Sequence, residues 1–87
     1  MSNSCVLVGR LTKDIEGDTI LLAVNRSFKN ETDFIPVEVW GGISENAKEY
    51  CHKGDLVGIR GRLETKENKL VVIAEKMTFL SSKHTEE

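Results

Sequence analysis

The sequence is poor in several features that mark whole classes of protein. It has one proline and two cysteines in 87 residues, aromatic residues make up only 6%, and 12 Lys and Arg stand against 14 Asp and Glu. So few cysteines argue against a disulfide-rich secreted scaffold. No apolar run approaches the roughly 20 residues of a membrane helix, and the first residues do not resemble a signal peptide. We therefore expect a cytoplasmic protein that makes no contact with a membrane.

Patterns for catalysis or metal binding are also missing. Cys5 and Cys51 fit no metal-ligand spacing, and we interpret them as reduced thiols that pack as small apolar side chains. His52 and His84 have no partners at metal or triad spacing. Residues 14–18 are rich in Asp and Gly but lack the full ligand spacing of a calcium loop, so a turn is the better interpretation. We expect no enzymatic activity, no metal and no cofactor.

The composition that remains is sufficient for one packed core. Hydrophobic residues make up 39% of the chain and charged residues 30%, the proportions of a folded globular domain. Eighty-seven residues leave no room for a second core. We predict a folded domain over residues 1–80 and a short polar tail over 81–87. The net charge of −2 argues against a polycation that coats DNA, although a local basic stripe would suffice to bind it.

The hydrophobic periodicity predicts five strands and one helix. Ser44 is predicted to cap the start of the helix, and Gly54 to end it. Strands, a helix and strands in this order are typical of the OB-fold, a five-stranded Greek-key barrel with the helix between strands three and four. A small α+β sheet and an SH3-like barrel would give similar patterns. The predicted strands are residues 5–13, 19–27, 34–40, 55–65 and 70–80.

The third strand alternates most clearly. Ile35, Val37 and Val39 are predicted to face the barrel interior, which leaves Phe34 and Trp40 on the outside. Flat rings outside a barrel suit the stacking of unpaired bases, because every base has a π-face and the contact needs no particular sequence. The competing interpretation is that these rings pack under a loop or at a subunit contact.

Other expectations concern single positions. Pro36 cannot donate a ladder hydrogen bond, so the third strand should have a free edge or a bulge there. An irregularity is predicted in the last strand near residues 75–76. Residues 20–24 are apolar on both parities, so their inward face is undetermined. Tyr50 and Phe79 are predicted to belong to the core.

Several blocks of this sequence resemble, in the same order, the bacterial single-stranded DNA-binding proteins. No single block is decisive, but together they run almost from end to end of the predicted domain. They are VLVGRLTKD at 6–14, LAVNRSF at 22–28, TDFIPV at 32–37, VWG at 39–41, ENAKEY at 45–50, KG at 53–54 and GRLET at 61–65.

The resemblance implies an OB-fold that binds single-stranded DNA in replication, repair or recombination and assembles into dimers or tetramers. The family's stacking aromatics correspond to Phe28, Phe34 and Trp40. Glu38 lies between two of these rings, and its carboxylate opposes a phosphate path unless one of the arginines pairs with it. Seven basic residues are our candidates for phosphate contacts: Arg10, Lys13, Arg26, Lys29, Arg60, Arg62 and Lys66.

Three departures from the family pattern matter. Segments 14–19 and 66–69 are shorter than the corresponding family loops, and the second carries no aromatic. The last residues, 84–87, lack the acidic tail with an apolar tip that the family uses to recruit repair and replication partners, so recruitment by that route is not expected. Two alternatives stay open: an OB-fold module for protein interaction in a replication complex, and a binder of single-stranded RNA.

Overall fold

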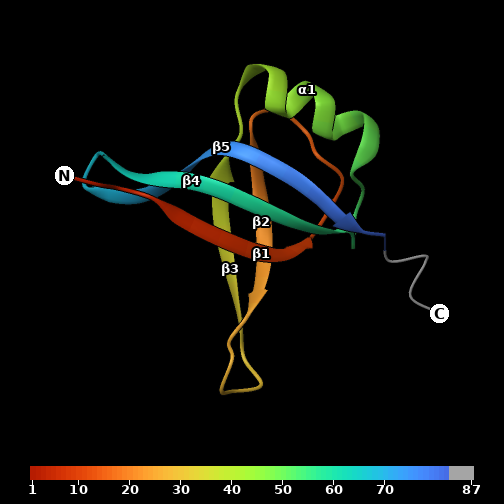
Figure 1. Ribbon diagram of the computed structural model, residues 1–87, viewed down its shortest axis with the longest axis horizontal. Helices are drawn as coiled ribbons and strands as arrows, with labels where there is room; N and C mark the ends of the chain where they lie inside the picture. The colour runs from red at the N-terminus through yellow and green to blue at the C-terminus, as the bar shows by residue number, and fades with distance from the viewer. Residues whose placement is uncertain (83–87) are drawn as a thin grey trace.

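Strands dominate the structure, a computed structural model in which residues 1–82 are described. The strands close into a barrel in the order β1-β2-β3-β5-β4 (Figure 1). This is the five-stranded barrel with one helix between the third and fourth strands that the sequence predicts, so the fold prediction is confirmed. The elements are β1 (Cys5–Leu11), β2 (Thr19–Asn25), β3 (Thr32–Glu38), α1 (Gly41–Tyr50), β4 (Leu56–Lys66) and β5 (Lys69–Ser81). Residues 83–87, most of the predicted tail, lie outside the described residues.

The core is made of aliphatic side chains and the Cys51 thiol, and no aromatic ring is buried in it. In β3 the predicted inward face is confirmed, because Val37 is buried and Ile35 is half-buried. The ambiguous run in β2 turns Ile20 and Leu22 inward and leaves Leu21 at the surface. Alternation along β2 and β3 thus directs one side of each strand into the barrel.

Pro36 lies where the sequence predicts a free edge. On one side it pairs with Leu21 of β2. On the other side β3 meets β5 only at Val37 and Glu38, in parallel. The missing N–H of the proline therefore costs no ladder hydrogen bond to β5.

A bulge in β5 decides which of its side chains face the helix. Arg60 of β4 stands opposite Lys76 and Gly61 opposite Ala74, so Glu75 is the extra residue and the predicted irregularity is confirmed. A side chain at Gly61 would collide with the carbonyl group of Ile73, so only glycine lets β5 come this close. Beyond the bulge the inward parity shifts by one residue.

The start of α1 differs from the prediction. The residue before the helix is Trp40, which makes no capping hydrogen bond through its side chain. Ser44 lies one turn inside the helix, is buried, and donates a hydrogen bond of 3.0 Å from its hydroxyl to the carbonyl oxygen of Gly17. Its role is to attach the helix to the segment between β1 and β2, so the predicted N-cap is wrong. The helix also ends earlier, at Tyr50, with Gly54 in the connection to β4.

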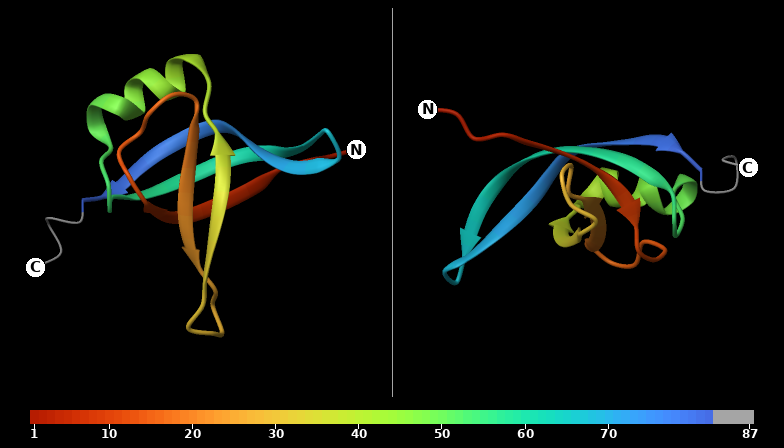
Figure 2. Two further views of the ribbon diagram at one scale, coloured as in Figure 1. Left: turned by 180° about the vertical axis from the view of Figure 1, so that it is seen from behind. Right: turned by 90° about the horizontal axis from the view of Figure 1, so that it is seen from below.

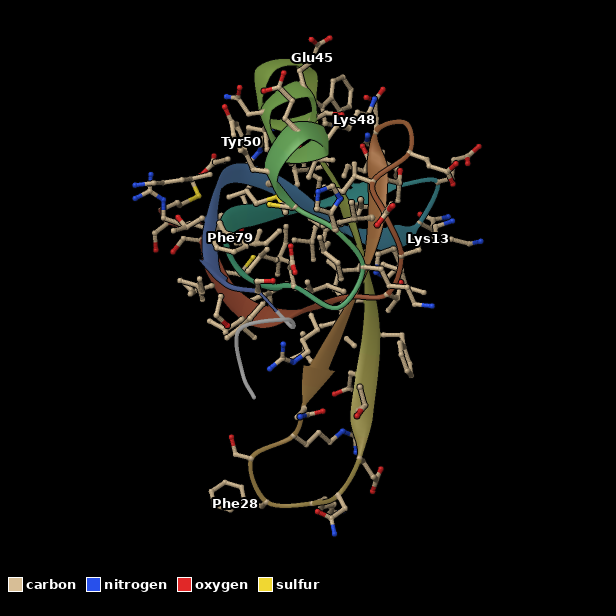
Figure 3. All side chains as sticks on the ribbon, turned by 90° about the vertical axis from the view of Figure 1, so that its right-hand side faces the viewer. Lys13, Phe28, Glu45, Lys48, Tyr50 and Phe79 are labelled. Atoms are coloured by element: carbon tan, nitrogen blue, oxygen red, sulfur yellow. The ribbon has the colours of Figure 1, made fainter. Side chains whose placement is uncertain are left out.

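The predicted burial of Tyr50 and Phe79 is also wrong. Tyr50 is the last residue of α1 and is 67% exposed, although the next residue, Cys51, is buried in the core. Phe79 follows the bulge near the end of β5 and is 45% exposed. Both rings lie on the same side of the molecule in Figure 3.

Two hairpins extend beyond the barrel. The β2–β3 hairpin projects from its body as a long arm, and the β4–β5 hairpin projects at another side (Figures 1 and 2). In the β4–β5 turn, Glu67 and Asn68 have φ values of 51° and 66°, which match the twist of a tight two-residue hairpin.

Candidate nucleic-acid interface

Phe34 stands on an outward row of side chains that crosses four strands. Register pairs join Leu56 of β4 to Arg10 of β1, Arg10 to Ala23 of β2, and Ala23 to Phe34 of β3. Phe34 is exposed and, with Arg10, lines a shallow hollow of about 450 Å³. The Arg10 guanidinium donates a 2.9 Å hydrogen bond to the carbonyl oxygen of Gly54, which holds it beside the row. The row joins one flat ring and one cation on the barrel's outer face.

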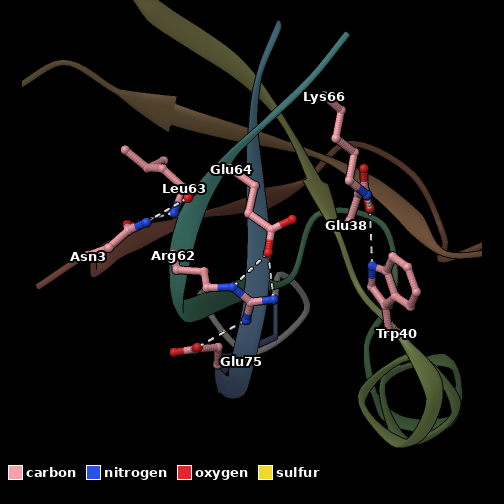
Figure 4. Close-up of polar contacts among 8 residues, drawn as sticks. All are labelled: Asn3, Glu38, Trp40, Arg62, Leu63, Glu64, Lys66 and Glu75. Carbon is pink, nitrogen blue, oxygen red and sulfur yellow. Dashed lines mark hydrogen bonds and ion pairs between the residues drawn. The ribbon is translucent and has the colours of Figure 1, made fainter. Parts of the chain in front are cut away.

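Trp40 stands in a cluster with an acid and a base. Its indole Nε1–H donates a 3.1 Å hydrogen bond to Glu38, and the Lys66 ammonium group bonds the same carboxylate oxygen at 2.8 Å (Figure 4). Lys66 also lies 5.1 Å from the centroid of the indole ring, a cation–π distance. Chiefly through the hydrogen bond from Lys66, the pKa of Glu38 is below its ordinary value. The expected partner of Glu38 was an arginine, and the structure gives it a lysine instead.

Arg62 faces Trp40 across a second hollow. Its guanidinium reaches Glu64 at 2.7 Å and Glu75 at 3.1 Å (Figure 4). These hydrogen bonds, the one to Glu64 first, raise the pKa of Arg62, so it stays charged. The hollow is about 660 Å³ and is lined by Trp40, Arg62 and Lys66, by the two carboxylates that bind Arg62, and by apolar side chains. One exposed ring and two predicted phosphate contacts therefore share a surface.

A third cluster of predicted DNA-contact residues lies at the end of the β2–β3 hairpin. Phe28 is 98% exposed there, next to the exposed Lys29 (Figure 3). Arg26 at the base of the loop bonds Asp33 through two nitrogens, at 2.8 and 3.0 Å, and Glu31 at 3.0 Å. Its hydrogen bond lowers the pKa of Asp33. Arg26 thus holds the two strands of the arm together.

Two candidate cations lie apart from these groups. Arg60 projects from β4 beside Val6 and Lys76, on a separate hollow of about 280 Å³. Lys13 lies in the segment between β1 and β2, beside the barrel body, whereas Phe28 marks the far end of the arm (Figure 3). The structure thus gathers eight of the ten predicted residues into three groups and leaves these two outside them.

Sequence reasoning missed two exposed rings, Tyr50 and Phe79. Their helical and strand spacing matches the core, so periodicity alone assigns them to it. The only indications of exposure were their positions, one shortly before Gly54 and the other near the end of the last strand. Spacing assigns a residue to one side of an element, but it does not tell whether other side chains already fill the core on that side.

Other chemistry finds little support in the described part of the chain. Within residues 1–82, no three His, Cys, Asp or Glu side chains are placed to hold a metal ion. Burial raises the pKa of the Cys51 thiol, which disfavours the nucleophilic thiolate. Over the same residues no helix has the length and apolar character to cross a membrane.

Comparison with known proteins gives relatives in sequence and in structure. The sequence profile described as the single-strand binding protein family matches residues 2–80. A single-stranded DNA-binding protein of Clostridium tetani is 47% identical over 78 residues, which cover 74% of this chain and 54% of that protein. This chain thus spans about half the length of that relative. Single-stranded DNA-binding protein 2 of Staphylococcus aureus is 42% identical over 107 residues, covering 97% of this chain and 76% of the relative.

The S. aureus alignment is longer than the chain itself. Since this chain has 87 residues, at least about 20 of the 107 aligned positions have no counterpart in it. The crystal structure of the mitochondrial single-stranded DNA binding protein of S. cerevisiae matches with a TM-score of 0.80, over 93% of this chain and 98% of the other, at 18% identity. That likeness supports the fold.

Proposed function

Since the chain belongs to the single-strand binding protein family, we propose that it binds single-stranded DNA without strong sequence preference, in replication, repair or recombination. The function is binding and not catalysis, and its place is the cytoplasm, where bacterial DNA lies. Bases would stack on Phe28, Phe34 and Trp40, while basic side chains contact the phosphates.

One observation carries the proposal. Phe34 and Trp40 lie outside a filled barrel, more than half exposed, with cations beside them. A base that stacks on such a ring removes two apolar faces from water, and each stack contributes about 1–3 kcal/mol whatever the base. The phosphate contacts remain those predicted: Arg10, Lys13, Arg26, Lys29, Arg60, Arg62 and Lys66.

A second feature favours self-association. β1 pairs with β2 only at Arg10 and Leu11, so among residues 1–82 the edge of β1 from Cys5 to Val8 has no partner strand on that side. Val6 and Val8 on this stretch are 71% and 50% exposed. An open edge with exposed apolar side chains is a template for strand pairing, and we propose that the protein acts as a homo-oligomer.

Titration with three ligands tests the binding function. Oligo-dT, oligo-rU and a duplex of equal length are added separately, and affinity is measured by anisotropy of the labelled ligand. We expect tight binding of dT and weak binding of the duplex, whose bases are already stacked on each other. Equal binding of rU would establish an RNA binder, and binding of none would favour the protein-interaction module.

A further inference from the structure

All five aromatic rings of this protein stand outside its core, and the proposed function uses three of them. The rings of Tyr50 and Phe79 remain in water although each could bury a large apolar surface. The barrel is filled without them, so packing does not account for their presence.

Tyr50 and Phe79 line one groove between α1 and β5. It encloses about 610 Å³. Ile43 and Tyr50 of the helix form one wall, and Met77 and Phe79 of β5 form the other. The bulge at Glu75 shifts the parity of β5 and so turns Met77 and Phe79 toward the helix. We call this hollow the α1–β5 groove.

The α1–β5 groove is continuous with the surface around Trp40. Trp40, Ile43 and Glu75 line both this groove and the hollow that contains Arg62 and Lys66. Trp40 stands at the start of α1 and Tyr50 at its end. Ten residues of helix separate them by about 15 Å, roughly the length of four nucleotides stacked at about 3.4 Å each. A strand that stacks on Trp40 can therefore continue along the groove.

The charges of the groove suit a phosphate backbone. Glu75 is the one carboxylate among its lining residues, and Arg62 already binds it at 3.1 Å. Lys76 also lines the groove, is exposed, and makes no ion pair with any residue of 1–82. One cation is thus available beside two rings.

We propose that the α1–β5 groove is a further binding site for the bases of single-stranded DNA, with Tyr50 and Phe79 as its stacking surfaces and Lys76 as a phosphate contact. The inference rests on the proposed function and adds a second stretch to the path of the strand. It predicts that affinity depends on these rings only when the oligonucleotide is long enough to reach them.

The test compares Tyr50→Leu, Phe79→Leu and the double variant with the wild type. Leucine keeps apolar bulk at an exposed position but removes the flat ring. Leu80→Ala is the matched control, because Leu80 is the next residue of β5, is 47% exposed, and does not line the groove. Each protein is titrated with oligo-dT of about 4 to 16 nucleotides, the range of site sizes for one OB-fold.

We expect a loss of about tenfold for each ring on the longest oligo-dT and no loss on the shortest, with the Leu80→Ala protein unchanged. Oligo-dT that carries 5-iododeoxyuridine should crosslink to Tyr50 or Phe79. Equal affinities at every length, with crosslinks confined to Phe28, Phe34 and Trp40, would leave the proposed function standing and overturn the groove. A loss of equal size at every length would overturn it too, since the rings would then act through the fold. A wild type that binds no oligo-dT would instead refute the proposed function itself.

Discussion

Trp40 is the only tryptophan, so its fluorescence reports on a single point of the surface. If a base stacks on it, oligo-dT should quench the fluorescence strongly and a duplex should quench it far less. Replacement by alanine should weaken dT binding by about 1–3 kcal/mol, the value of one stack. Because the ring is 58% exposed, the thermal unfolding midpoint should change little.

The contrary result for Trp40 is equally specific. If Trp40→Ala splits an oligomer or unfolds the chain, while DNA leaves the wild-type fluorescence unchanged, the ring serves a subunit contact. Circular dichroism and sedimentation velocity of the variant distinguish these outcomes.

Glu38 forms an ion pair with Lys66 and so competes with a DNA phosphate for that ammonium group. Its carboxylate holds Lys66 at 2.8 Å, and because the pKa of Glu38 is lowered it is ionised at neutral pH. Glu38→Gln should release Lys66 and raise the affinity for oligo-dT roughly two- to fivefold, the worth of an exposed ion pair. In the wild type, affinity should rise in the same way as the pH falls through the lowered pKa of Glu38.

The control for Glu38→Gln is Glu67→Gln. Glu67 lies in the β4–β5 turn, so its replacement changes the net charge equally but releases no lysine, since no ion pair joins Glu67 to residues 1–82. An equal gain in both variants would show a general charge effect and contradict the role given to Glu38.

The β2–β3 arm depends on the pair between Arg26 and Asp33. The pKa of Asp33 is lowered from 3.8, so the pair is complete above pH 3.8 and is lost as the pH falls through the lowered value. Asp33→Asn should therefore speed amide hydrogen exchange in residues 26–31 at neutral pH, with the barrel strands unaffected. Exchange at the wild-type rate would mean that Thr32 and Asn25, joined at 2.8 Å, suffice to order the arm.

At the scale of elements, hydrophobic periodicity predicts which side chains are buried where a strand packs against the barrel core. The alternation predicted over residues 34–40 gives the burial of Val37 and Val39, because each step along an extended chain changes sides. It fails for Tyr50 because helical spacing gives the side of the helix but not whether other side chains already fill the core there. Ser44 has the chemistry of a cap, but the carbonyl group that its hydroxyl bonds belongs to Gly17, 27 residues away. The exposure of Phe34 and Trp40 could be predicted from alternation and resemblance, whereas the ion pairs near Trp40 depend on tertiary contacts.

The molecule as a whole should bind DNA with a shallow salt dependence. The net charge is −2, and Arg26, Arg62 and Lys66 already have carboxylate partners. For single strands the logarithm of the binding constant falls by about 0.7 per neutralised phosphate for each unit of log salt, so we expect a slope between about −1 and −3. Titrations of oligo-dT at several salt concentrations measure it. An affinity independent of salt would refute the predicted phosphate contacts.

Self-association should depend on the open edge of β1. Val6→Lys places a charge among the exposed apolar side chains of that edge, and edge lysines oppose strand pairing. Sedimentation equilibrium should show a smaller particle than for the wild type. Glu45→Lys, on the exposed surface of α1 (Figure 3), should leave the particle unchanged. A wild type that sediments as a monomer at all concentrations would refute the assembly.

The absence of aromatic rings from the core bears on how such a chain can vary over generations. Folding draws on one set of side chains and ligand contact on another, with no ring belonging to both. A substitution at an exposed ring alters what is bound at little cost in stability, since substitutions away from the packed interior usually change it by less than about 0.5 kcal/mol. Substitutions that change ligand affinity can therefore accumulate while the fold stays intact. A protein of this kind can thus evolve to bind other nucleic acids or other partners.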